Sequence, residues 1–563
     1  MAKISRRTAL SMTLSSLVAS VSACATIPTD GEVNHYADPQ ATGSTAGTSA
    51  GPQGPQPGAS PSEIIEGFLH AGTGVKDDYS VARQYLTKDL AQSWRPDGRT
   101  LVYNSSFTTR ATGENSYVVA VPTSTEIDNR GLATSYTTFT DTEIEFSLEK
   151  VQQEWRISAV PDGTVLSRTE FGEVFNPFTL YFYDPTFTYA VPDIRWFAER
   201  STIATSLIRV LLEGPAPYLE GAVVTAVPQE TRLAINSVPV ENGVADIQLA
   251  GGNALVTASA LETERLRTQL TQALSNLATV ASVQMSINNQ VVAAQNLENY
   301  KEPTINAVVS GAVVGIENNR LVSRSALVDT ASQQTIVEGV AYGAITQPAM
   351  NYTRNFYAYT NAGRNEIWLA NSNRSGSIHR GNGILQPSFD HLNWLWLGEQ
   401  GGRVRAYPAG QENGELLTVK TWLTEETVHS LAIARDGSRA LVVTSVGGND
   451  YAAWVSAIRR ASDGTPQELM APVRIGSDIN PRGAEWHTDE EVFLWNTETT
   501  QTEIVSLSGH STQYDPLQGI VRIVTGNGLD QAVAMTDENG LYIVAGRSWT
   551  RIETSLSEVN YSG

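Results

Sequence analysis

Three segments in the second half of this 563-residue chain share one pattern, and that pattern constrains the fold more than any other feature of the sequence. Each segment has a polar turn around an aspartate that leads directly into an apolar strand. The aspartates are Asp390, Asp436 and Asp489, so the pattern recurs at intervals of roughly 45–55 residues. This spacing is typical of the blades of a β-propeller. A sandwich of two packed sheets is the alternative.

The chain from about residue 301 to residue 563 contains short apolar strands with turn signals between them and lacks long helical patterns. Runs rich in Val, Leu, Ile and Trp between polar turns are typical of all-β architectures. About 260 residues at the blade spacing allow five or six blades. We therefore predict an all-β propeller over residues 301–563.

Residues 170–295 combine strands with amphipathic helices, which indicates an α+β domain. One helix ends at Gly214-Pro215, a glycine stop followed by a residue that cannot continue a helix. Asn242-Gly243 lies between two short apolar runs and predicts a β-hairpin. Ser259 and Glu262 form a capping box at the start of a long later helix. This succession resembles the GerMN domain, a module of bacterial cell-surface and spore proteins.

A second α+β domain is predicted over residues 61–165. Ser60, Pro61 and Glu63 mark the start of its first helix, because a capping serine, an early proline and a glutamate three residues on satisfy the free amides there. A second helix is expected from about residue 79 to residue 94. Several alternating strands follow, and a helix pair that leads into a curved sheet resembles the NTF2-like fold.

Residues 24–60 contain few large apolar side chains and are rich in Gly, Pro, Ser, Thr and Gln. Such a segment cannot bury enough apolar surface to offset the loss of chain entropy on folding. We predict that it is a disordered tether.

The single cysteine of the chain, Cys24, ends the sequence Val21-Ser22-Ala23-Cys24. It follows a basic start and an apolar stretch of about 13 residues, too short to span a bilayer. Residues 1–23 therefore read as a lipoprotein signal peptide, and the segment resembles the bacterial lipobox, in which the thiol receives a diacylglyceryl group and the new amine is acylated, for example with palmitate. Arg6-Arg7 also fits a twin-arginine signal, so that export route and the general one both stay open.

The net charge of −21 excludes some classes of partner. Proteins that bind nucleic acid need a basic surface to neutralise phosphates, so we predict no nucleic-acid partner. Adhesion of the acidic body to anionic lipid is equally disfavoured, which leaves the lipid anchor on Cys24 as the predicted contact with the membrane.

The sequence contains no recognisable catalytic or ligand-binding motif. Its seven histidines are dispersed without ligand spacing, and a second cysteine is lacking. Paired carboxylates such as Asp77-Asp78, Glu425-Glu426 and Asp489-Glu490-Glu491 fit a solvated acidic surface better than glycosidic acid/base work. We therefore predict no catalytic, metal or cofactor site, and lipidation of Cys24 is the one site residue we assign. The densest aromatic cluster should be mostly core, and any members left on the surface would suit an interface. It comprises Tyr181, Phe182, Tyr183, Phe187, Tyr189, Trp196 and Phe197.

The order of lipobox, tether, NTF2-like segment, GerMN segment and propeller resembles the LpqB lipoprotein family of actinobacteria over nearly the full length. The resemblance implies a non-enzymatic accessory protein on the extracytoplasmic face of the cell membrane. It also implies a partner: the extracellular domain of a membrane sensor kinase of the Mtr two-component system, with a role in cell-envelope homeostasis and division.

A second hypothesis stays open beside this one. A cell-envelope protein of this architecture could instead bind or process a glycan or a peptide, held at the mouth of the propeller or in an NTF2-like cavity.

Overall fold

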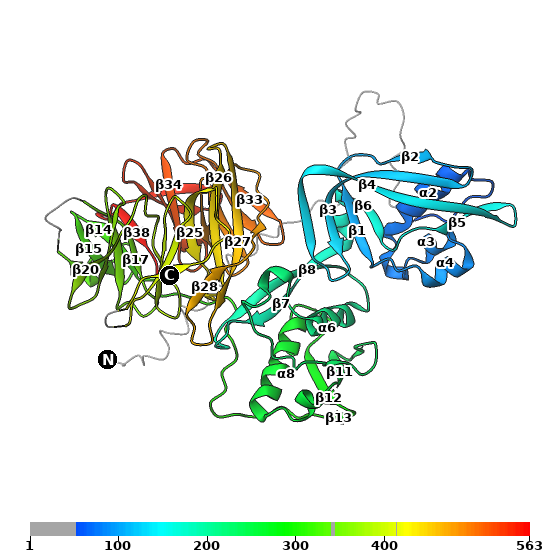
Figure 1. Ribbon diagram of the computed structural model, residues 1–563, viewed down its shortest axis with the longest axis horizontal. Helices are drawn as coiled ribbons and strands as arrows, with labels where there is room; N and C mark the ends of the chain where they lie inside the picture. Colours follow the sequence, from blue (N-terminus) through cyan, green and yellow to red (C-terminus); the bar gives the residue numbers. More distant parts are fainter. Residues whose placement is uncertain (1–51, 339–343, 412–413) are drawn as a thin grey trace, which may run out of the picture. The chain divides into compact units, whose positions relative to one another are not determined.

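The computed structural model describes residues 52–338, 344–411 and 414–563 (Figure 1). The lipobox, with Cys24, and the first part of the predicted tether lie outside the described residues. Within the described ranges, no helix combines the length and the apolar character that a membrane crossing requires.

The first module packs short helices against a curved sheet with the strand order β5-β4-β3-β1-β6 (Figure 1). Neighbouring strands are antiparallel except β1 and β6, which run parallel. Strand β2 adds to the sheet by pairing with β3. The elements are α2 (Pro61–His70), η1 (Ala71–Thr73), η2 (Val75–Asp77), α3 (Ser80–Gln84), α4 (Lys88–Ser93), β1 (Arg99–Tyr103), β2 (Thr108–Ala111), β3 (Ser116–Asp128), β4 (Ala133–Val151), β5 (Glu154–Ala159) and β6 (Thr164–Ser167).

Helix α2 begins as the sequence predicts. The Ser60 hydroxyl accepts the amide of Glu63, and the Glu63 carboxylate accepts the amide of Ser60, which completes the capping box. One face of the helix buries Ile64, Ile65, Phe68 and Leu69 against the sheet. Each such side chain stabilises the fold by about 1.5–3 kcal/mol.

The single helix predicted from residue 79 to residue 94 is wrong. Two short helices, α3 and α4, stand there instead, because the backbone between them pairs with the edge strand β5. The amide of Ile157 donates to the carbonyl of Tyr85, and the amide of Thr87 donates to the carbonyl of Ile157. A continuous helix would have used those same backbone groups internally.

Residues 52–60, which the sequence analysis assigns to the tether, contact the first module. The Tyr85 hydroxyl donates to the carbonyl of Gln53 at 2.8 Å, and the amide of Gly58 donates to Glu154 at 2.9 Å. Contacts with the body therefore begin before the helix start at Ser60.

The second module contains a long two-stranded hairpin, β7–β8, and a small sheet covered by two helices. Helices α6 and α8 share one core with the sheet, in which β11 and β12 are parallel neighbours. The Ser259–Glu262 capping box is present at the start of α8. The elements are α5 (Arg168–Val174), β7 (Phe175–Tyr183), β8 (Ala190–Ala198), α6 (Ile203–Glu213), η3 (Pro217–Leu219), β9 (Arg232–Leu233), β10 (Val240–Glu241), β11 (Val244–Ala250), α7 (Asn253–Val256), α8 (Ala260–Leu274), β12 (Ser282–Ile287) and β13 (Gln290–Val291).

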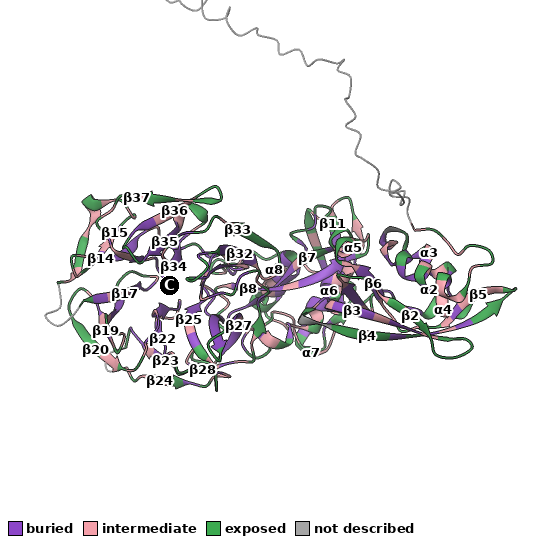
Figure 2. Cartoon of the chain, turned by 90° about the horizontal axis from the view of Figure 1, so that it is seen from above, coloured by how far each residue is buried: buried purple, intermediate pink, exposed green. Residues whose placement is uncertain are grey.

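The third module is a β-propeller, and its described residues form six sheets that each contain a path of four strands. The innermost strands β38, β17, β21, β25, β30 and β34 contact one another in that order, and β34 returns to β38. Figure 2 shows this ring, with outer strands such as β20 and β37 mostly exposed. The first sheet is completed by the last strand of the chain, because β38 pairs with β14.

The strands of the propeller have the following bounds: β14 (Val313–Glu317), β15 (Arg320–Arg324), β16 (Gln334–Val337), β17 (Ile345–Met350), β18 (Tyr357–Asn361), β19 (Glu366–Ala370), β20 (Ser375–Arg380), β21 (Ser388–Phe389), β22 (Trp394–Gly398), β23 (Val404–Pro408), β24 (Leu417–Val419), β25 (Thr427–Ile433), β26 (Arg439–Val446), β27 (Asp450–Arg460), β28 (Pro466–Leu469), β29 (Val473–Arg474), β30 (Gly483–Trp486), β31 (Glu491–Trp495), β32 (Thr502–Ser506), β33 (Ser511–Tyr514), β34 (Ile520–Thr525), β35 (Ala532–Thr536), β36 (Leu541–Ala545), β37 (Ser548–Ile552) and β38 (Glu558–Asn560). Two 3-10 turns lie among them, η4 (Thr330–Ser332) and η5 (Leu529–Gln531).

Candidate functional site

The three aspartates of the sequence repeat occupy equivalent places in three consecutive blades. Asp390 lies in the turn between β21 and β22, Asp436 between β25 and β26, and Asp489 between β30 and β31. All three are buried, with at most 6% of the residue surface exposed. A buried carboxylate needs hydrogen-bond or ion-pair partners, so each turn has to provide them.

Asp390 illustrates how a turn does so. One carboxylate oxygen accepts the amides of Leu392 and Trp394, each at 2.9 Å. The other accepts the Trp396 indole at 2.9 Å and the Arg460 guanidinium at 2.6 Å. Arg460 comes from β27 of the next blade, and its other donors reach the carbonyls of Gly437 and Gly464. The repeat therefore joins neighbouring blades through buried polar contacts.

The turn of the next blade brings Gly437 against His391. Gly437 has a φ of +68°, which glycine adopts without strain. A Cβ at this position would lie 2.6 Å from the Cδ2 atom of His391, so any side chain here would clash with the histidine. Asp436 accepts the amide of Ser438 at 2.7 Å and pairs with the Arg439 guanidinium at 2.6 Å.

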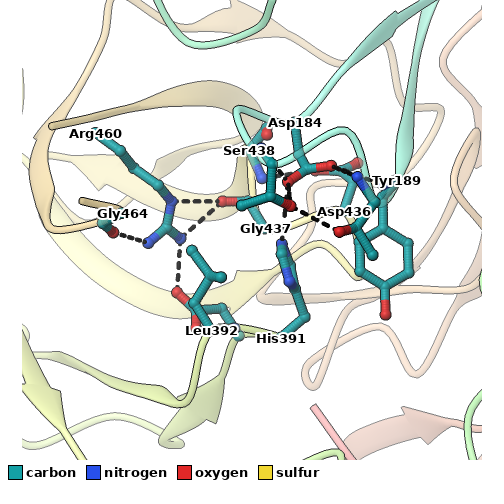
Figure 3. A network of polar contacts seen from close by, with 12 residues as sticks. Asp184, Tyr189, His391, Leu392, Asp436, Gly437, Ser438, Arg460 and Gly464 are labelled. Carbon is teal, nitrogen blue, oxygen red and sulfur yellow. Dashed lines mark hydrogen bonds and ion pairs between the residues drawn. The ribbon is translucent and has the colours of Figure 1, made fainter. Parts of the chain in front are cut away.

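A turn of the second module contacts this part of the propeller (Figure 3). Asp184 directly follows β7 and begins the turn of the β7–β8 hairpin, and it is 1% exposed. Its carboxylate accepts the amides of Thr186, Thr188 and Tyr189 at 2.6–2.9 Å, and it also accepts the hydroxyl of Thr186. These bonds fix the turn that carries Tyr189.

His391 is the propeller residue that meets the hairpin turn. Its Nε2 atom lies 3.9 Å from the Asp184 carboxylate, and its ring packs edge-on against Tyr189 at 4.6 Å between centroids. Burial lowers the pKa of His391, while the nearby carboxylates of Asp184 and Asp390 oppose that shift. The ring of His391 is therefore packed between the two modules.

The segment that links the second module to the propeller reaches three further blade turns. The amide of Thr304 donates to Thr188 of the hairpin, and Arg435 donates to the carbonyl of Ala307 at 2.8 Å. Asn527 exchanges two hydrogen bonds with Val309, at 2.7 and 2.8 Å. The backbone of Asn306 hydrogen-bonds Asp489.

We call this set of contacts the hairpin–propeller junction: the turn 184–189, the linker 304–309, and the blade turns that hold Asp390, Asp436, Asp489 and Asn527. Burial raises the pKa of Asp489 to about 6, and the charge of Asp436 acts in the same direction. Such a junction holds two modules together. The carboxylates of Asp184, Asp390 and Asp436 are each engaged with backbone amides or guanidinium groups.

The other residues considered in the sequence analysis are dispersed. Cys24 and His35 lie outside the described residues, and His379 pairs with Glu399 at 3.0 Å. Of the aromatic cluster, five members are buried, whereas Phe187 and Tyr189 are half-buried in the hairpin turn. Two members of the cluster contact rings of the propeller: Tyr189 packs against His391, and Trp196 stacks on His510 at 5.9 Å between ring centroids. Within the described ranges, no three His, Cys, Asp or Glu side chains lie close enough together to hold a metal ion.

Sequence reasoning missed Asp184, Arg435 and Arg460 as junction residues. The run from Asp184 to Tyr189 carries a turn signal, an aspartate before Pro and Thr, that could have located the hairpin tip. The arginines give no local signal, because the contacts that matter, from Arg435 to Ala307 and from Arg460 to Asp390, join residues distant in the sequence.

Comparison with protein families identifies the architecture. The family described as "Lipoprotein LpqB, N-terminal domain" matches residues 54–172, and the one described as "Lipoprotein LpqB beta-propeller domain" matches residues 320–559. The chain belongs to the LpqB lipoprotein family. Between these two matches, a family described as "Sporulation and spore germination" covers residues 179–293. The LpqB propeller match agrees with the six-sheet ring, whereas the NTF2-like resemblance of the first module stays a prediction.

Individual LpqB relatives differ in how much of the chain they match. Lipoprotein LpqB of Bifidobacterium longum is 34% identical over 36% of this chain and 38% of its own length. That of Cutibacterium acnes is 25% identical over 60% of each chain, so the match spans less than two thirds of each of these two relatives. The Mycobacterium bovis protein is 23% identical over 84% of each.

Among solved structures, TolB from Acinetobacter baumannii is similar to 46% of this chain and 68% of its own, at 15% identity and a TM-score of 0.33. A similarity this low has no bearing on function.

Proposed function

We propose that this LpqB family member is a lipid-anchored accessory protein that binds the extracellular domain of a membrane sensor kinase of the Mtr type. The observation that carries the proposal is the match of two separate LpqB domains in one chain. The lipobox at Cys24 supports the anchor, which places the body on the extracytoplasmic face of the cell membrane.

The lipid anchor would act by raising the effective concentration of the protein near its partner. Two partners confined to one membrane meet at a high effective concentration, so a weak contact becomes populated. Two or more acyl chains give stable attachment, where a single chain gives only marginal binding. A contact that favours one conformer of the kinase sensor domain shifts its signalling equilibrium by the difference in affinity between the two conformers.

The junction supports a binding role for the body. Asp184 and Asp390 are buried with their carboxylates hydrogen-bonded, and the linker hydrogen-bonds Arg435 and Asn527 of the blade turns, so the second module and the propeller form one connected unit. A partner would then meet a preorganised surface and would not have to order the modules on binding.

The test uses the full-length, acylated chain in lipid nanodiscs and the purified extracellular domain of the kinase. Titration should give saturable binding, while the extracellular domain of an unrelated sensor kinase gives none. Absence of saturable binding to every form of the kinase domain contradicts the proposal.

A second assay distinguishes the accessory role from the alternative function, in which the protein processes a glycan or a peptide. Cell-wall fragments are incubated with the same nanodiscs, and the products are analysed by mass spectrometry. New cleavage products that depend on the protein would favour the alternative over the accessory role.

A further inference from the structure

The linker between the second module and the propeller is long and has no regular secondary structure. The structure describes all of residues 292–312, between β13 and β14, and none of them belongs to a helix or a strand. Long loops of this kind are uncommon in compact folds, and many of them have a binding or covering role. Residues 306–309 of this linker lie on blade turns of the propeller.

The side chains of this stretch alternate between buried and exposed. Ala307 is 6% exposed, Val308 is 80% exposed and Val309 is 8% exposed. An extended chain produces such an alternation when one of its sides lies against a surface, because successive side chains point in opposite directions. The two side chains that are buried here are small and apolar.

Side chains of two blade turns bind the backbone of the same stretch. Asn527, in the turn after β34, donates to the carbonyl of Val309 at 2.7 Å and accepts the amide of Val309 at 2.8 Å. Arg435, in the turn after β25, donates to the carbonyl of Ala307 at 2.8 Å and to the carbonyl of Gly526 at 2.6 Å. When proteins bind extended peptides, bonds to the main chain provide affinity and burial of alternate side chains provides specificity. The linker is held on the propeller in both of these ways.

We propose that this surface of the propeller is a binding site for an extended peptide with small apolar residues at alternate positions, and that the linker occupies the site in cis. The ligand in trans is a segment of a partner protein with the same pattern, bound through its backbone by Asn527 and Arg435. A tethered segment has an effective concentration in the roughly millimolar range, so the linker keeps the site closed to weak competitors. The inference concerns the propeller alone and does not depend on the proposed kinase contact.

The test is fluorescence anisotropy with the full-length chain in detergent micelles and a labelled peptide that has the sequence of residues 303–312. In the chain, Val309→Asp should release the linker, because a carboxylate is costly to bury without a partner. The peptide should then bind saturably, and at least about tenfold more tightly than to the unaltered chain, whose linker competes with it. Val308→Asp is the matched control: the same charge one residue away faces solvent, so the site should stay closed.

Substitutions in the peptide and in the site assign the binding. With the Val309→Asp chain, a peptide that carries Val308→Asp should bind like the unaltered peptide, whereas a peptide that carries Val309→Asp should bind at least about tenfold more weakly. In the same chain, Asn527→Asp should weaken binding of the unaltered peptide about tenfold. The new carboxylate still accepts the amide of Val309 but cannot donate to its carbonyl.

A second variant and a folding control accompany the test. Ala307→Asp introduces the same charge at the other buried position, so it should also release the linker if Val309→Asp disrupts folding. Hydrogen exchange of the strand amides in β26 and β35 verifies that the propeller of each variant is folded.

Two results overturn the proposal. One is the absence of saturable binding at millimolar peptide to both the Val309→Asp and the Ala307→Asp chain, which would leave the linker with a connecting role only. The other is binding that Val309→Asp in the peptide, or Asn527→Asp in the chain, leaves unchanged.

Discussion

Replacing Gly437 with alanine should loosen the hairpin turn of the second module, although the substitution lies in the propeller. The new Cβ would stand 2.6 Å from Cδ2 and 2.8 Å from Nε2 of His391. The histidine must then move, and its edge-on contact with Tyr189 is lost.

The free-energy cost of Gly437→Ala has two contributions. A side chain at a φ of +68° costs about 1–2 kcal/mol in backbone strain. Loss of the aromatic contact costs a further 0.5–1.5 kcal/mol or so, which corresponds to about a two- to tenfold increase in local opening of the hairpin. Gly447 provides the matched control, because it has a φ of +60° and open space around its Cα, so Gly447→Ala carries only the strain.

Amide hydrogen exchange measured by mass spectrometry is the appropriate assay, because global unfolding of a chain with several modules is not a two-state process. The amides of Thr188 and Tyr189 donate to Asp184, and the amide of Thr304 donates to Thr188. Their exchange should be faster in Gly437→Ala and unchanged in Gly447→Ala. Unchanged exchange in Gly437→Ala, or equal acceleration in both variants, would refute the reasoning.

Three further predictions concern the propeller core and the anchor. Burial raises the pKa of Asp489 from 3.8 to about 6, so the protonated carboxyl stabilises the folded chain below about pH 4, and this stability is lost as the pH rises through 6. Asp489→Asn should flatten that part of a plot of unfolding midpoint against pH. Burial lowers the pKa of His487 from 6.5 to about 4, so the folded chain loses stability as the pH falls between these values, and His487→Gln should remove that loss in the same measurement. Cys24→Ala should move the protein from the membrane fraction to the soluble fraction in cell fractionation, and a variant that stays membrane-bound would refute the anchor.

The regular parts of the fold were predictable because their signals are local. The capping boxes at Ser60 and Ser259 lie within single turns, and the repeat around Asp390, Asp436 and Asp489 marks the blade turns directly. The exact number of blades was not predictable, because the innermost strand of the first sheet, Glu558–Asn560, comes from the far end of the propeller sequence.

The junction was harder to predict, because it depends on pairs of residues distant in the sequence. Asp184 and His391 belong to different modules, and nothing near either residue specifies the other. The same reason explains the wrong helix between residues 79 and 94: the helical pattern is real, but the backbone of Ile157 pairs with Tyr85 and Thr87 and divides it. In both cases a tertiary contact overrides what the local sequence favours.

The most direct test of the central claim is photo-crosslinking of the acylated chain in its own membrane, followed by mass spectrometry of the crosslinked peptides. The account predicts crosslinks from the body to the extracellular domain of the sensor kinase, which disappear when Cys24→Ala releases the chain from the membrane. Crosslinks only to proteins other than a sensor kinase, or kinase crosslinks that persist at full yield in Cys24→Ala, would contradict it.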